Sequence, residues 1–209
     1  MKCETCGVYF LPGVSEQEIA EYYASGKYRS SNQQRDETAH QRRRAANIVR
    51  YLKSPKVFLD VGCSAGILMD VVREQFGAEC YGVDPDPVLA HNVYKDIKDA
   101  PILADCVTLI HSLEHMPHPL DALKDVYSKM SPGGQIVIEV PNGDLENPPC
   151  YLGVFKFPHV VMFSMPALHW TMERAGFCVE NTVIHGDGGL VKAGKFYYLL
   201  VSGRKLAEL

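Results

Sequence analysis

Short apolar runs alternate with Gly, Pro and Asp between residues 56 and 141, whereas residues 1–55 are polar and rich in Tyr, Arg and Gln. Such runs between turn-forming residues are typical of buried strands. They predict strands at 57–61, 80–84, 92–95, 106–110 and 135–140. Between these strands, apolar residues recur at helical spacing from Leu68 to Phe76 and from Leu120 to Met130, which predicts two helices. The turn residues 131–134 should close the second helix. Strands joined through helices pair in parallel, so we expect a sheet covered on both faces.

The last third of the chain has a different pattern. Ser164 is suited to cap a helix that ends at Gly176, and apolar runs at 177–184 and 196–201 predict two more strands. The glycine-rich link 185–195 is too short for a crossover helix, so these two strands should form an antiparallel hairpin at the sheet edge. The expected fold is α/β, with a seven-stranded, mostly parallel sheet whose last strand is antiparallel.

Composition narrows the class of protein. A chain of 209 residues predicts one globular unit, 56–209, with an N-terminal helical segment, 1–55, over its ligand site. The net charge of −4 makes nucleic acid an unfavourable partner. No apolar run reaches the ~20 residues of a membrane span, and residues 1–6 lack the apolar stretch of a signal peptide. Seven cysteines, an odd number, indicate free thiols and a cytoplasmic location.

The loop after the first predicted strand carries the main candidate binding site. Gly62 allows a sharp turn there, and Gly66 allows a ligand or the sheet to approach the backbone closely. Asp84 ends the next strand, where it could hold ribose hydroxyls. Parallel sheets bind ligands at these carboxyl ends. The plain alternative is a tight turn without a ligand.

Charge distinguishes the nucleosides that such a loop could bind. A dinucleotide would place its pyrophosphate beside Asp60, and Ser64 replaces the middle glycine of the dinucleotide fingerprint. Further carboxylates follow the neighbouring strands, at Asp84, Asp86, Asp96, Asp99 and Asp105. This cluster of carboxylates repels phosphate and attracts cations, so a positively charged nucleoside is favoured over NAD.

Four segments carry a family resemblance. They are VFLDVGCSAG (57–66), YGVDPDP (81–87), DCVTLIHSLEHMPHP (105–119) and SPGGQIVIEVPN (131–142). In this order they resemble the motifs of class I S-adenosylmethionine-dependent methyltransferases, most of all the small-molecule branch with a His-x-Leu-Glu-His motif. Residues 157–164 and 176–177 resemble that branch more loosely. The resemblance implies a Rossmann-like fold, with S-adenosylmethionine as cofactor and S-adenosylhomocysteine as product.

The resemblance also implies residue roles. Asp60 would face the ammonium group of the cofactor, Asp84 the ribose hydroxyls and Asp96 the adenine amino group. A solvated strand-end carboxylate is the alternative for Asp60 and Asp96. The segment 85–92 is shorter than the helix that family members carry there, which weakens the adenine-side assignments. The implied cofactor-binding residues are Asp60, Gly62, Cys63, Ser64, Gly66, Asp84, Pro85, Asp96, Ile97, His111 and Ser112.

The N-terminal segment contains a Cys-x-x-Cys pair, Cys3 and Cys6, that resembles one knuckle of a zinc ribbon. Structural zinc needs four ligands, so we favour a metal-free remnant. The alternative is a homodimer that shares zinc between these half sites. Aromatic and basic residues after the knuckle, Tyr22, Tyr28 and Arg29, would line the substrate pocket by resemblance, or else pack a helix onto the sheet.

Three histidines are candidates for a general base, because imidazole titrates near neutral pH. His111 is the first choice, at the strand end nearest the transferred methyl group, followed by His115 and His159. Glu114 and His115 could instead brace the turn. The expected activity is methyl transfer to oxygen or carbon of a small-molecule acceptor, such as a sugar or a quinone-like ring. The alternative is a catalytically silent accessory protein that binds S-adenosylmethionine.

Overall fold

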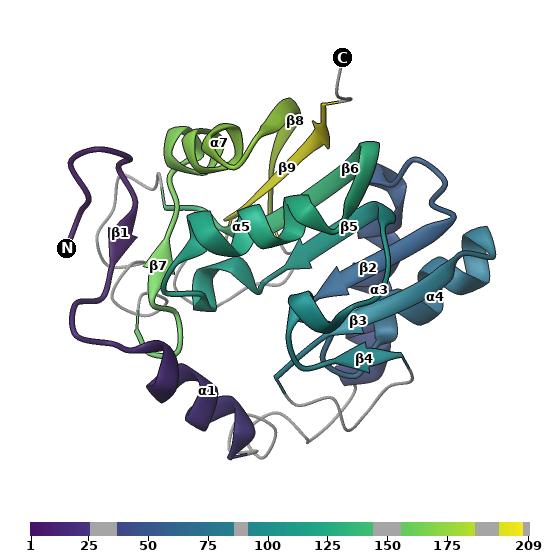
Figure 1. The fold of residues 1–209 in the computed structure, drawn as a ribbon, viewed down its shortest axis with the longest axis horizontal. Helices are drawn as coiled ribbons and strands as arrows, with labels where there is room; N and C mark the ends of the chain where they lie inside the picture. The colour runs from purple at the N-terminus through teal and green to yellow at the C-terminus, as the bar shows by residue number, and fades with distance from the viewer. Residues whose placement is uncertain (26–36, 86–91, 144–155, 187–196, 207–209) are drawn as a thin grey trace.

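The structure is a computed structural model that describes residues 1–25, 37–85, 92–143, 156–186 and 197–206. Within these residues one sheet has seven strands in the order β4-β3-β2-β5-β6-β9-β8 (Figure 1). The first five pair in parallel and β9 is antiparallel to both neighbours. The predicted α/β fold with a terminal antiparallel hairpin is confirmed. The strands are β2 (Val57–Val61), β3 (Glu79–Val83), β4 (Val93–Tyr94), β5 (Ala104–Ile110), β6 (Met130–Pro141), β8 (Phe177–Gly186) and β9 (Tyr197–Lys205).

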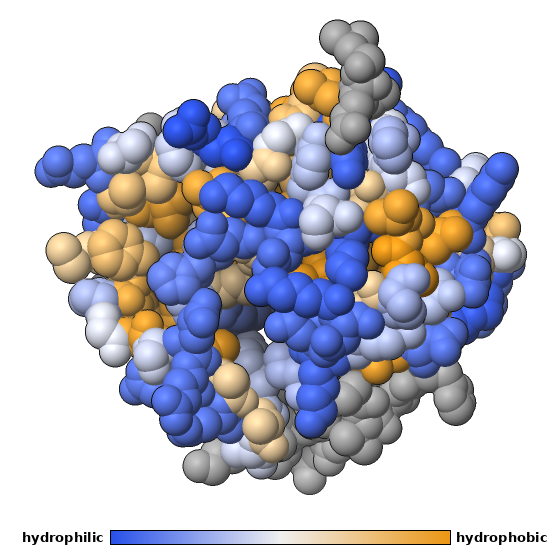
Figure 2. Space-filling view, in the orientation of Figure 1, coloured by the Kyte–Doolittle hydropathy of each residue, from blue (hydrophilic) through white to orange (hydrophobic). Residues whose placement is uncertain are grey.

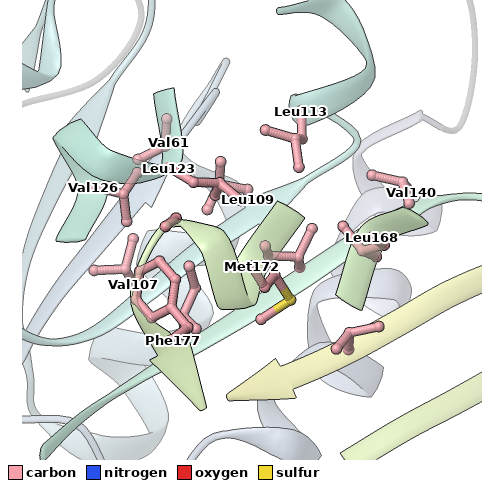
Figure 3. Packing of buried hydrophobic residues seen from close by; sticks show 14 of the residues in the cluster. Val61, Val107, Leu109, Leu113, Leu123, Val126, Val140, Leu168, Met172 and Phe177 are labelled. Carbon is pink, nitrogen blue, oxygen red and sulfur yellow. The ribbon is translucent and has the colours of Figure 1, made fainter. Parts of the chain in front are cut away.

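Helices cover both faces of this sheet, as the alternating pattern requires. On one face lie α5 (Pro119–Ser128) and α7 (Met165–Arg174), and on the other α3 (Glu37–Ile48) and α4 (Ile67–Phe76) (Figure 1). Figure 3 shows Val126 of α5 and Met172 of α7 packed with Val107 of β5. Full burial of such a side chain contributes about 1.5–3 kcal/mol, so this apolar layer supplies much of the stability that holds the strand ends in place.

Helix ends follow the predicted signals, with one exception. Gly77 caps α4 in the left-handed conformation, and the Ser164 side chain accepts the Ala167 N–H at the start of α7. The helical spacing that ran to Met130 was misleading, because α5 ends at Ser128 and Met130 already pairs with Ala104 in β6. The turn residues 131–134 then bulge out of β6 before Gln135 pairs with Cys106.

A second, two-stranded sheet joins distant parts of the described chain. Strand β1 (Tyr9–Phe10) pairs antiparallel with β7 (Val161–Met162). Helix α1 (Glu16–Ala24) follows β1 and begins with a capping box between Ser15 and Glu18. Figure 2 shows a hollow between α1 and the main sheet. None of the helices in the described ranges is both long and apolar enough to cross a bilayer.

Candidate active site

A pocket of about 270 Å³ lies at the carboxyl ends of β2, β3 and β5, with α1 closing it on the opposite side. Ile19 and Tyr23 of α1 contribute to its wall. Three carboxylates, Asp84, Asp96 and Asp125, line it together with Lys95, and Asp125 pairs with Lys98 at 3.3 Å. The predicted residues that the structure brings together there are Gly62, Ser64, Asp84, Pro85, Asp96, Ile97, His111, Ser112 and His115.

Gly62 is required where the ends of β2 and β5 meet. Its backbone has φ of +83°, and a Cβ added to it would lie 2.5 Å from the Cβ of Ser112. The Ser112 hydroxyl donates a hydrogen bond to the Val61 carbonyl at 2.7 Å. This bond holds the end of β2 against the residues that follow β5. A side chain at position 62 would therefore push the two strand ends apart and deform the pocket floor.

The turn after Gly62 is held by Asp84. The Ser64 backbone N–H donates to Oδ2 of Asp84 at 2.8 Å, and Ser64 itself has φ of +47°. This bond fixes the direction of the Asp84 carboxylate at the end of β3. The predicted loop-and-carboxylate pair is therefore one hydrogen-bonded unit.

Asp96 and Ile97 form the wall beyond β4. Asp96 caps the 3₁₀ turn η3 (Ile97–Asp99), because its Oδ1 accepts the Lys98 N–H at 2.9 Å. Ile97 is buried with its apolar side chain in the pocket wall. The short segment before β4 does not prevent these two residues from reaching the pocket.

Asp60 lies below the pocket floor. It is 4% exposed and accepts a hydrogen bond from the Thr108 hydroxyl at 2.7 Å. Burial, together with the charge of Asp84, raises the pKa of Asp60 to about 7, although the Thr108 bond opposes the shift. Among the described residues it is not part of the pocket wall, so its role toward an ammonium group stays a prediction.

Cys63 and Gly66 support the loop without lining the pocket as described. A Cβ on Gly82 of β3 would lie 2.5 Å from the Cys63 sulfur, so this thiol fills the space that the glycine leaves. Burial raises the pKa of the Cys63 thiol. Gly66 starts α4 with φ of +74°. Both residues are therefore placed to shape the turn.

His111 contacts a buried carboxylate at each of its ring nitrogens. Nδ1 lies 3.2 Å from Glu114 of the turn η4 (Leu113–His115), and Nε2 lies 3.0 Å from Glu139 of β6. Both glutamates have only 1% of their side chains exposed. Burial lowers the pKa of His111, but the contacts with Glu114 and Glu139 outweigh it and raise the value to about 8. His111 is therefore a cation at neutral pH.

Sequence reasoning missed Glu139. Its Oε1 accepts a hydrogen bond from Arg44 of α3 at 2.7 Å, and its Oε2 lies 2.8 Å from Nε2 of His185 in β8. Burial would raise the pKa of Glu139, but His111, His185 and Arg44 hold it well below its usual range. The signal that could have revealed it is one acid inside the apolar run IVIEV.

His115 and His159 lie side by side, with ring centroids 4.7 Å apart. Nδ1 of His115 is 3.0 Å from the Pro158 carbonyl oxygen, and Nε2 is 4.0 Å from Oε1 of Glu114. One potential ligand atom from each of Glu114, His115 and His159 falls within a spread of 4.8 Å. Zinc ligands in a formed site lie about 3.4 Å apart, so this arrangement is wider than a preformed metal site.

The side of the pocket next to α1 is aromatic. Tyr23, rather than the predicted Tyr22, lines the pocket, and its ring meets His115 edge to face at 5.9 Å. Tyr22 instead packs against Tyr23 and against Phe157, at 5.3 and 4.9 Å. The predicted Tyr28 and Arg29 lie outside the described residues.

The Cys-x-x-Cys knuckle lies at the far end of β1. Hydrogen bonds from the backbone of Cys6 lower the pKa of the Cys3 thiol, while burial raises that of Cys6. In the part of the chain that the structure describes, no third His, Cys, Asp or Glu joins them in a ligand group. The homodimer that would share zinc stays a prediction.

Comparison with known proteins identifies the family. The family model described as "Methyltransferase domain" matches residues 32–182, which is more than half of the chain. The chain belongs to this methyltransferase-domain family. The methyltransferase that the motifs predicted is therefore confirmed at the level of the family.

Curated relatives of this methyltransferase domain include ubiquinone biosynthesis O-methyltransferases. That of Pseudomonas entomophila is 30% identical over 115 residues, 46% of this chain and 48% of the relative. That of Pseudomonas fluorescens SBW25 is 30% identical over 129 residues, 53% of this chain and 54% of the relative. The chain thus matches about half the length of these relatives.

Solved structures share the fold of the methyltransferase domain. A Burkholderia thailandensis 1,6-didemethyltoxoflavin-N1-methyltransferase, solved with 1,6-didemethyltoxoflavin and S-adenosylhomocysteine, has a TM-score of 0.68 at 19% identity, covering 96% of this chain and 94% of that one. A SAM-dependent methyltransferase from Archaeoglobus fulgidus has a TM-score of 0.63 at 20% identity, covering 88% and 99%.

Proposed function

We propose that this protein is an S-adenosylmethionine-dependent methyltransferase of the small-molecule branch, acting on oxygen or carbon of its acceptor. The observation that carries the proposal is the pocket at the strand ends, where the carboxylates Asp84 and Asp96 line the wall beside Gly62 and Ser64. A cationic nucleoside is favoured in such a pocket, whereas a pyrophosphate is repelled.

The residues present fit this cofactor. Gly62 keeps the pocket floor free of a side chain, since a Cβ there would meet Ser112. Asp84, oriented by the Ser64 N–H, is placed to accept from ribose hydroxyls. Asp96 and Ile97 line the same pocket, where the first would accept from the adenine amino group and the second would pack against its ring. When bound, the cofactor supplies an activated methyl group as a sulfonium.

The acceptor side supports a small molecule with an ionisable hydroxyl. Tyr23 and His115 form an aromatic wall next to the cofactor pocket, which suits a planar or apolar acceptor. The relatives that are named ubiquinone biosynthesis O-methyltransferases favour oxygen over carbon. The protein's contribution is to align the acceptor and exclude water, which supplies up to roughly 7–11 kcal/mol of the rate enhancement in well-oriented reactions.

Thermal unfolding with S-adenosylhomocysteine or NAD tests the proposal. A ligand at 100 times its Kd stabilises the protein by about 2.7 kcal/mol. For a chain of this size the Tm should rise by roughly 5–10 °C. We expect this rise with S-adenosylhomocysteine and none with NAD. The opposite pattern would overturn the proposal.

Asp84→Asn localises the binding. The amide can still accept the Ser64 N–H but lacks the charge that strengthens bonds to ribose hydroxyls. We expect Kd for S-adenosylhomocysteine to rise about 10- to 100-fold, measured by calorimetry, with the fold intact by circular dichroism. The control is Asp99→Asn, an exposed carboxylate in η3 that is not among the pocket residues. Equal effects of the two variants would exclude Asp84 as the ribose ligand.

A further inference from the structure

A row of ionisable side chains runs from α3 into the pocket. It consists of Arg44, Glu139, His111, Glu114 and His115, with successive contacts of 2.7, 3.0, 3.2 and 4.0 Å. The first member holds α3 against the sheet, and the last lines the pocket beside Tyr23. Both glutamates are buried, so their charges act through a medium that screens them weakly.

We propose that His115 takes the proton of the methyl acceptor and that Glu139 is a positioning residue that keeps His111 as a fixed cation in this row. The inference rests on the proposed function, and it reverses the order in which sequence reasoning ranked the two histidines. It adds a residue near the carboxyl end of β6 to the machinery of the site.

His111 has no nitrogen left for an acceptor. Each ring nitrogen lies within 3.2 Å of a buried carboxylate oxygen, and although neither contact has the geometry of a hydrogen bond, the two negative charges favour an N–H on both nitrogens. With two N–H groups the ring carries a positive charge and has no lone pair with which to take a proton. His111 therefore balances the charge of Glu114 and does not act as a base.

His115 has the opposite arrangement. A backbone carbonyl oxygen only accepts hydrogen bonds, so the 3.0 Å contact with Pro158 requires the proton on Nδ1. Nε2 then carries the lone pair. Burial lowers the pKa of His115, although Glu114 opposes this shift, so the ring is neutral at pH 7. A neutral imidazole with a fixed tautomer in the pocket wall has the properties of a general base.

The charge row explains how His115 stays neutral at rest and is stabilised after proton transfer. At rest the His111 cation compensates Glu114, so Glu114 attracts a proton to His115 only weakly. When the acceptor oxygen bonds to the methyl carbon, the carbon–sulfur electron pair stays on sulfur and the acceptor O–H proton moves to Nε2 of His115. The new imidazolium then lies next to Glu114 and extends the alternation. The proton later leaves to water.

Every element packed around His111 contributes to its charge state. Glu114 comes from η4, Glu139 from β6, Arg44 from α3 and His185 from β8. The Tyr198 ring of β9 meets His111 edge to face at 4.8 Å. Arg44 and His185 both contact Glu139, and the charge of Arg44 also lowers the pKa of His111 directly.

Nitrogen-15 NMR of the histidine rings tests the charge states without an acceptor. In the protein with S-adenosylhomocysteine at pH 7, we expect His111 protonated on both nitrogens and His115 protonated on Nδ1 alone. In Glu139→Gln the His111 titration should move down by at least one pH unit. Glu180→Gln is the matched control, because this β8 carboxylate pairs with Lys53 and Arg204 and not with His111. A neutral His111, or His115 protonated on Nε2, would overturn the inference.

Methyl transfer tests the role of each residue, with 3,4-dihydroxybenzoate as the probe acceptor. His115→Gln should lower kcat by 10²–10⁴-fold while the Tm rise with S-adenosylhomocysteine persists. In Glu139→Gln, His111 loses its charge more easily and Glu114 then raises the pKa of His115. The acid limb of the kcat profile should therefore move to higher pH, an effect that a loss of stability alone would not produce.

The outcomes separate the two proposals. If wild type does not bind S-adenosylhomocysteine, the proposed function fails. If it binds and transfers the methyl group, but His115→Gln keeps its kcat within threefold, only the present inference fails. An unchanged acid limb in Glu139→Gln would likewise remove Glu139 from the machinery. If the probe is not methylated, the NMR result alone decides on the two histidines.

Discussion

Gly62 shows how one position can carry the shape of the pocket floor. Alanine there would adopt φ of +83° and place its Cβ 2.5 Å from that of Ser112. The left-handed conformation costs about 1–2 kcal/mol, and the collision adds about 1–3 kcal/mol. We therefore expect Gly62→Ala to lower the free energy of unfolding by roughly 2–5 kcal/mol in urea and to weaken S-adenosylhomocysteine binding.

Gly133 provides the matched control for this effect. It also has a positive φ, +77°, but nothing lies within 4 Å of a Cβ added there. Gly133→Ala should lose only the conformational part, about 1–2 kcal/mol, and should bind the ligand as wild type does. Equal losses of stability in the two variants would mean that the strand ends adapt to a side chain at position 62.

Asp60 should make stability depend on pH. Its pKa rises from 3.8 when unfolded to about 7 when folded, so between these values the folded protein binds more protons than the unfolded one. The Asp60 contribution to the free energy of unfolding therefore decreases as pH rises from about 4 to 7. Asp60→Asn should remove this decrease and be more stable than wild type at pH 8, by roughly 2–4 kcal/mol.

Chemical denaturation at pH 4, 6 and 8 measures this difference. The advantage of Asp60→Asn should be near zero at pH 4 and largest at pH 8. A constant difference at all three values would mean that Asp60 ionises in the folded protein at its ordinary pKa.

The residues of the site differ in how well the sequence around them predicts their role. Gly62, Ser64 and Asp84 follow strands that the apolar runs located, so their meeting at one sheet edge was predictable. Glu139 was not, because its partners Arg44 and His185 lie far from it along the chain. A buried acid can be noticed in an apolar run, but the cations that compensate it come from tertiary structure.

At the scale of the element, α1 is a short helix in the pocket wall. It is nine residues long, and Ile19 is its buried residue. Its start depends on the Ser15–Glu18 capping box. Ser15→Ala should cost about 1 kcal/mol within this helix. Hydrogen exchange at residues 19–24 should become about fivefold faster, and S-adenosylhomocysteine should bind a few-fold more weakly, because Ile19 and Tyr23 close the pocket.

Gln17→Ala is the control for the cap. Its side chain bonds Glu21 on the exposed face of the same helix, and such a pair contributes only about 0.2–0.5 kcal/mol. Exchange should therefore change little. If both variants accelerate exchange equally, the capping box does not hold α1.

Elements with a repeating pattern were predictable and those without one were not. All seven strands of the main sheet had apolar runs, including the two-residue β4. The pairing of β1 with β7 had no such signal, because two residues show no alternation and the partners are more than 150 positions apart. The bulge at 131–134 was read as a helix-closing turn because Pro and Gly mark both kinds of irregularity.

Across the whole molecule, the two walls of the pocket come from different parts of the chain. The wall assigned to the cofactor lies within the continuous stretch from Val61 to Val126. The wall assigned to the acceptor consists of Tyr23 of α1 and of His115, whose ring contacts the Pro158 carbonyl. The β1–β7 pairing joins the segment before α1 to the segment after Pro158.

That two-stranded pairing makes the acceptor wall a separable module. On the proposed function, exchanging the first 24 residues together with residues 156–162, β7 included, for those of a homologue should change the metabolite that is methylated while nucleoside recognition stays intact. Exchanging either segment alone would pair strands from two different proteins at Tyr9–Phe10 and Val161–Met162. New specificities in this lineage should therefore arise through paired changes at these two distant places in the chain.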